Sequence, residues 1–92
     1  MLNEDLKVIH NKSQKRFEIQ IDSHLAVLNY AMQGTTITFT HTGVPPALEG
    51  RGIGSLLAKT GLQYAKDNNL KIQTLCWFVD KYIQRHPEYQ QG

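Results

Sequence analysis

The hydrophobic pattern of this chain changes period at one glycine-rich segment, Gly50–Ser55 (GRGIGS), and this change constrains the fold most. An extended apolar segment ends before it at Val44, and apolar residues recur at helical spacing after it from Ile53. The order is therefore a strand, a glycine turn and a helix. Glycines permit positive φ and close backbone approach, so consecutive N–H groups beside the helix N-terminus can bind an anion. The pattern predicts a pyrophosphate site.

The residues after the glycine turn predict a parallel crossover. The helical stripe contains Ile53, Leu56, Leu57, Gly61, Tyr64 and Ala65. Asp67-Asn68-Asn69 supplies a stop, and Leu70–Cys76 (LKIQTLC) follows as a strand. A strand, helix and strand of this length form a right-handed parallel unit, which puts the glycine turn at the carboxyl ends of the strands, where open α/β sheets bind ligands. A last helix is expected at about Phe78–His86, ending before Pro87.

The first half of the chain predicts an antiparallel meander. Alternation of apolar and polar residues predicts strands at Asp5–Asn11, Arg16–Ile21 and Ala26–Met32, with turn-forming residues between them. A fourth strand, Thr35–Val44, ends at Pro45-Pro46. In this strand Ile37, Phe39 and His41 are predicted to share one face. The fold class is therefore mixed α/β (α+β), with an antiparallel meander followed by β-α-β-α.

Size, charge and cysteine content restrict the function. The 92 residues are expected to form one domain, 1–92, and a net charge of +2 is too small to predict nucleic-acid binding. No apolar run approaches the roughly 20 residues that cross a bilayer, and no secretory signal is evident, so a cytoplasmic protein without membrane contact is expected. One cysteine and four histidines show no zinc-binding spacing, so we expect no metal.

Two motifs in the expected order carry a family resemblance. HTGVPPALEGRGIGSLL, which begins at His41, and LCWFVDKYIQRHPEY, which ends at Tyr89, resemble the small single-domain members of the GCN5-related N-acetyltransferase (GNAT) superfamily. The similarity covers about half of the chain. The preceding residues agree with this family in strand order only.

The resemblance implies an acetyl-CoA-dependent N-acetyltransferase that acts on an amine of a small molecule or a protein. The signature glycines fall on Gly52 and Gly54, and Val44 matches the strand residue whose backbone pairs with the pantetheine arm. Gly50, Arg51, Ile53 and Ser55 complete the implied CoA-binding segment, to which Ser55 adds a hydroxyl donor. The family signature is Arg/Gln-x-x-Gly-x-Gly/Ala, and its first position falls on Glu49. This is a departure from the signature, and a carboxylate that faced a pyrophosphate would repel it. We expect Glu49 to turn away and Arg51 or a nearby lysine to supply positive charge.

Three side chains are candidates for catalysis, each with a structural alternative. His41 is either a general base or a hydrogen-bonded strand residue beneath the helix. Cys76 is either an acyl carrier or a small buried hydrophobe, and direct transfer is preferred because neither His nor Lys adjoins it in sequence. Tyr82 is either a proton donor to the thiolate or a packed aromatic. Trp77 and Phe78 either wall the acceptor pocket or belong to the core.

Two other classes of function stay open. One is a non-catalytic acyl-CoA-binding module, which needs the same glycine turn. The other is a small nucleotide- or RNA-binding α/β protein that binds phosphate through this turn. The Gly-Lys-Ser/Thr triplet of the nucleotide P-loop is absent, and most aromatic residues occupy core-like positions rather than a basic face.

Overall fold

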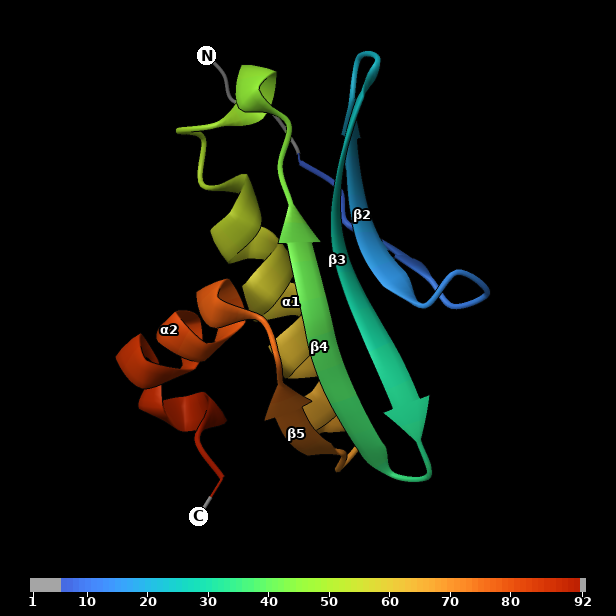
Figure 1. Ribbon diagram of the computed structural model, residues 1–92, viewed down its shortest axis with the longest axis vertical. Helices are drawn as coiled ribbons and strands as arrows, with labels where there is room; N and C mark the ends of the chain where they lie inside the picture. The colour runs from blue at the N-terminus through green and yellow to red at the C-terminus, as the bar shows by residue number, and fades with distance from the viewer. Residues whose placement is uncertain (1–5, 92) are drawn as a thin grey trace.

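A five-stranded mixed sheet forms the centre of the computed structural model, which describes residues 6–91. The strand order is β1-β2-β3-β4-β5, in which β5 is parallel to β4 and the other neighbours are antiparallel (Figure 1). The elements are β1 Ile9–Asn11, β2 Arg16–Ile21, β3 His24–Gln33, β4 Thr36–Gly43, α1 Ile53–Asp67, β5 Lys71–Thr74 and α2 Trp77–Arg85. Short 3₁₀ helices follow β4 at Pro46–Leu48 and α2 at Pro87–Tyr89.

This architecture confirms the predicted fold class, including the parallel crossover through α1. The bounds of β2 agree with the prediction, and α1 begins at Ile53 as expected. The predicted first strand began at Asp5, which lies outside the described residues, and the observed strand begins only at Ile9. The strand before α2 is shorter than predicted because its last pairing with β4 is at Thr74.

The core lies between one face of the sheet and α1. Figure 1 shows α1 crossing behind the sheet, with α2 beside the edge strand β5. The largest fully buried side chains are Phe17, Phe39, Ile19, Leu28, Ile37, Leu48, Ile53, Leu57, Leu62 and Val79. Gly61 lets α1 approach the sheet closely, because a Cβ atom there would lie 2.9 Å from Phe39 Cε1. α1 is thus held directly against β3 and β4, and β4 is the strand that leads to the glycine turn.

A β-bulge in β4 overturns the predicted faces of this strand. Tyr30 pairs with Phe39, and its neighbour Asn29 pairs with His41, so Thr40 is the extra residue. Directly paired residues point to the same face, and the buried Tyr30 and Phe39 face α1. His41 therefore lies on the opposite, open face, and the prediction that it shares a face with Phe39 is wrong.

No helix formed by residues 6–91 combines the length and the apolar character that crossing a membrane requires.

Candidate functional site

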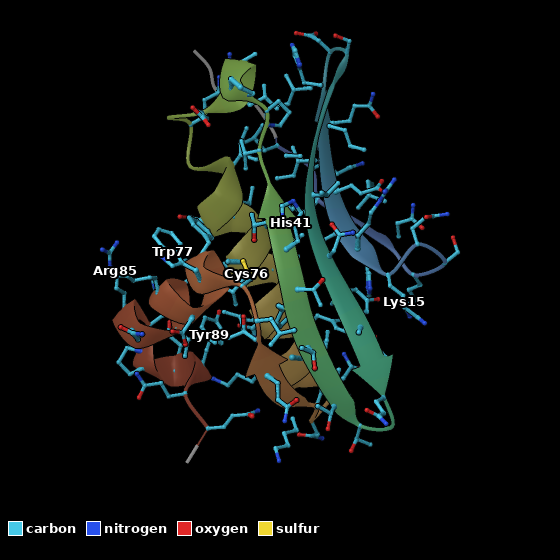
Figure 2. The ribbon with its side chains drawn as sticks, in the orientation of Figure 1. Lys15, His41, Cys76, Trp77, Arg85 and Tyr89 are labelled. Atoms are coloured by element: carbon cyan, nitrogen blue, oxygen red, sulfur yellow. The ribbon has the colours of Figure 1, made fainter. Side chains whose placement is uncertain are left out.

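A cavity of about 680 Å³ opens at the carboxyl ends of β4 and β5. Its lining residues lie within three segments: 40–44 at the end of β4, 48–55 before and within the first turn of α1, and 75–78 from the end of β5 into the first turn of α2. Figure 2 shows His41, Cys76 and Trp77 around this region. The cavity therefore joins the predicted anion-binding turn to two of the candidate catalytic residues, His41 and Cys76.

The glycine turn leaves free backbone donors at one end of the cavity. Gly50 and Gly52 have φ values of 85° and 74°, and Gly52 is the N-cap of α1 without a side-chain cap. The first amide that bonds within the helix is that of Leu56, which donates to the Gly52 carbonyl at 3.0 Å. The preceding amides have no acceptor within the helix, and no acidic residue occupies its first turn. Their dipoles favour an anion here.

The two parallel strands separate beside this turn. Their pairing ends where the Leu75 amide donates to the Phe39 carbonyl at 2.8 Å, whereas β4 continues to Gly43. The chain then turns away from β4 at Cys76 to begin α2. The resulting gap leaves the end of β4 without a strand partner on that side.

Cys76 lies at the inner wall of the gap and is 9% exposed. Its Sγ is 3.3 Å from Thr42 Oγ1, and its backbone amide donates to Thr74 Oγ1 at 2.9 Å. The Thr74 hydroxyl in turn donates to the Cys76 carbonyl at 3.0 Å. These contacts fix the residue at the turn between β5 and α2. A buried thiol with a hydroxyl partner fits the structural alternative given above.

His41 lines the cavity from the open face of the sheet and is exposed. The alternative of a strand histidine beneath α1 is wrong, because the bulge turns the residue to the other side. Its Nε2 lies 3.1 Å from the point that a Cβ on Gly43 would occupy, so the ring rests over that glycine. Asn29, directly opposite on β3, has a buried Oδ1 that accepts no hydrogen bond within residues 6–91. The imidazole of His41 thus lies at the cavity wall formed by the end of β4.

Two aromatic residues form the outer wall of the cavity. Trp77 is 72% exposed, so it does not belong to the core, and Phe78 is partly buried. Phe78 packs against Gly54, where a Cβ atom would lie 3.0 Å from its Cζ. Both residues line the cavity, as one of the two sequence readings expected.

Arg51, Glu49 and Tyr82 lie differently from the sequence expectation. Arg51 is exposed and is not among the lining residues, whereas Glu49 is. Tyr82 lines a separate hollow beside α2, where its ring stacks on His86 at 3.9 Å. Burial raises the pKa of Tyr82, and the neighbouring Tyr89 and Glu88 raise it further. The structure therefore does not bring Tyr82 together with His41 and Cys76.

Sequence reasoning did not single out Thr40, Thr42 or Leu48 as residues of the site. The signal for the two threonines was their place beside His41 at the end of a strand that precedes the glycine turn. Leu48 lies in the 3₁₀ helix Pro46–Leu48, which was not predicted because the two prolines indicated only the end of a strand. Within the described part of the chain, no group of three or more His, Cys, Asp or Glu side chains is arranged to hold a metal ion.

Comparisons with known proteins agree with this geometry. The model of a family described as GCN5-related N-acetyl-transferase matches residues 16–92. The protein NATD1 of Danio rerio is 37% identical over 89 residues, which span 91% of this chain and 81% of the relative. NATD1 of Homo sapiens is 34% identical over 85 residues, which span 89% of this chain and 75% of the relative.

One solved structure is similar over nearly the whole chain. It is the NMR solution structure of a GCN5-like candidate N-acetyltransferase from Staphylococcus aureus. Its TM-score is 0.72 at 32% sequence identity, and the match covers 92% of this chain and 84% of the other. Sequence and backbone geometry thus point to one family.

Proposed function

This chain belongs to the GCN5-related N-acetyltransferase family, and we propose that it transfers the acetyl group of acetyl-CoA to an amine. The observation that carries the proposal is one cavity that contains both the unpaired amides of the α1 N-terminus and the gap between β4 and β5. Its volume of about 680 Å³ lies within the range of sites for small molecules and cofactors. A phosphate site alone does not need a strand gap.

Apart from the carboxylate of Glu49, the residues that surround the cavity fit acetyl-CoA. The positive φ at Gly52 and the open space around its Cα let a pyrophosphate approach the amides of Ile53, Gly54 and Ser55. The backbone near Val44 can pair with the pantetheine arm. When bound, acetyl-CoA supplies an acetyl group that is activated as a thioester.

The protein's own groups have two tasks in the transfer, and solvent has a third. His41 accepts a proton from the ammonium form of the acceptor, directly or through water, because only a neutral amine has the lone pair that attacks. A backbone N–H at Val44 or a neighbour donates to the carbonyl oxygen as negative charge develops there. Solvent in the open cavity can return a proton to the departing thiolate.

Direct transfer to the amine is the route that we propose for this site. Cys76 is buried against Thr42, and among the described residues neither Lys nor Arg lines the cavity around it. An acyl-carrying cysteine needs a base or a positive charge beside its sulfur, whereas the partner found here is a neutral hydroxyl. Cys76 then shapes the wall of the gap.

Two measurements test the proposal. Thermal unfolding is followed with acetyl-CoA, ATP and an oligonucleotide, and acetyl-CoA alone is expected to raise Tm, since a ligand of the native state stabilises it. Release of free CoA is then followed with small amines and with lysine-containing peptides as acceptors. Binding without CoA release from any acceptor supports a non-catalytic module instead. A shift with ATP or the oligonucleotide but not with acetyl-CoA contradicts the proposal.

A further inference from the structure

A second hollow of about 240 Å³ lies beside α2 and adjoins the cavity. Both are lined by Ser55, Trp77 and Phe78, so these residues form a shared wall. The hollow continues along α2 past Lys81, Tyr82 and Arg85 to His86. A ligand on the first turn of α1 at Ser55 therefore has access to both spaces.

The second hollow is positively charged. Lys81 and Arg85 are one helical turn apart, and both line it. Among residues 6–91, the one ion pair is Arg16 with Glu18, so neither cation is paired with a carboxylate. Asp80 is engaged by Gln84, which donates to it at 3.1 Å, and no acidic residue lines the hollow. An anion at this place gains attraction without displacing an internal partner.

The rim of the hollow also presents an aromatic surface. Trp77 is 72% exposed although it stands between two concave surfaces. Its ring stacks on Phe78 with an interplanar angle of 26°. A large exposed indole next to two cations is suited to a ligand with a flat base and a phosphate group.

We propose that this hollow binds the 3′-phosphoadenosine end of CoA, with Trp77 against adenine and Lys81 and Arg85 at the 3′-phosphate. The inference rests on the proposed function. In CoA the pyrophosphate joins the pantetheine arm to the adenosine. With the pyrophosphate at the amides of α1 and the pantetheine arm in the strand gap, the adenosine therefore lies on the side of the pyrophosphate that faces away from the gap. At Ser55 that side is the shared wall, beyond which the two cations lie. Lys81 and Arg85 then select CoA against its 3′-dephospho form.

Calorimetric titration with acetyl-CoA and with acetyl-3′-dephospho-CoA tests the selection. The wild-type protein is expected to bind acetyl-CoA about tenfold more tightly, because charge-assisted hydrogen bonds to the extra phosphate contribute that much or more. The double variant Lys81→Gln/Arg85→Gln is expected to bind both ligands with the same, lower affinity. Lys59→Gln, which neutralises an exposed cation elsewhere on α1, is the control that keeps the wild-type ratio.

Trp77 provides a second readout, because it is the one tryptophan of the chain. Its fluorescence is expected to be quenched by both CoA forms and to be unaffected by phosphopantetheine, which lacks adenosine. Equal affinity of the wild-type protein for the two CoA forms, or loss of the ratio in Lys59→Gln, overturns the inference alone. If neither form binds, the proposed function and this inference fall together.

Discussion

The ring of Phe78 lies 3.0 Å from the point that a Cβ atom on Gly54 would occupy. This contact brings the start of α2 against the first turn of α1, and both residues line the cavity. A glycine in the family signature thus has a packing role here in addition to the phosphate access that we propose for it. The position of α2 therefore depends on the absence of a side chain at Gly54. The wall between the cavity and the hollow depends on it as well.

Gly54→Ala is expected to lower the free energy of unfolding, because the added methyl group meets the Phe78 ring at the distance given above. Overpacking of this kind costs about 1–3 kcal/mol, part of which the helix preference of alanine offsets. Chemical denaturation of Gly54→Ala, Phe78→Leu and the double variant measures the coupling. The substitution at Gly54 is expected to cost less beside Leu than beside Phe. Additive effects would show that α2 yields without strain.

Gly52→Ala is expected to abolish acetyl-CoA binding while the protein stays folded. A Cβ atom there meets no protein atom within 4 Å, so the cost to folding is the positive φ alone, about 1–2 kcal/mol. Gly34 is a matched control, because its φ is 60° and its Cβ position is equally open, but it lies in the turn after β3. Gly34→Ala should lose similar stability and keep the wild-type Kd. Equal Kd values for both variants would contradict the site.

The sequence predicted what depends on neighbouring residues in the chain. The period change at Ile53 and the positive φ at Gly52 are local, so the start of α1 and the glycine turn before it were predictable. The face of His41 was not, because the bulge at Thr40 depends on how β3 and β4 pair. The hollow beside α2 was also unpredictable, because it forms only when Phe78 docks on Gly54.

The stability of the protein is expected to fall with acidification because of His10. Burial lowers the pKa of His10 below its ordinary 6.5, and the charge of Lys12 lowers it further. The ring stacks on Phe17 at 4.1 Å and its Nε2 hydrogen-bonds with the Tyr30 hydroxyl at 2.6 Å, an environment that favours neutral imidazole. The unfolded chain then takes up the proton at a higher pH than the folded chain. The contribution is full above pH 6.5 and is lost as the pH falls toward the folded-state pKa.

Denaturation of the wild-type protein and of His10→Gln between pH 8 and about pH 5 measures this contribution. The difference in the free energy of unfolding is expected to shrink below pH 6.5, where the wild-type protein loses its advantage. The other histidines are common to both proteins and cancel in the difference. Parallel curves would mean that His10 is protonated alike in the folded and unfolded states.

Cys76→Ala is expected to retain acetyl transfer, because the thiol acts as part of the wall beside Thr42. Stability should fall, since the substitution removes a buried sulfur atom and its contact. Mass spectrometry of the wild-type protein with acetyl-CoA should detect no acetyl group that hydroxylamine removes. A hydroxylamine-sensitive acetyl group that disappears in Cys76→Ala together with turnover would establish an acyl-enzyme route.

His41→Ala is expected to lower kcat by about 10²–10⁴-fold and to remove one ionisation from the pH profile, because the acceptor amine loses its proton acceptor. Binding of acetyl-CoA should change little, since the pyrophosphate contacts lie at the other end of the cavity. His24→Ala, at the start of β3 and outside the cavity lining, is the matched control and should leave kcat unchanged. Gly43→Ala offers an independent variant: its Cβ would lie 3.1 Å from His41 Nε2, so the ring must move. This variant should lower kcat yet keep the ionisation, whereas wild-type kcat in His41→Ala would leave deprotonation of the amine to solvent.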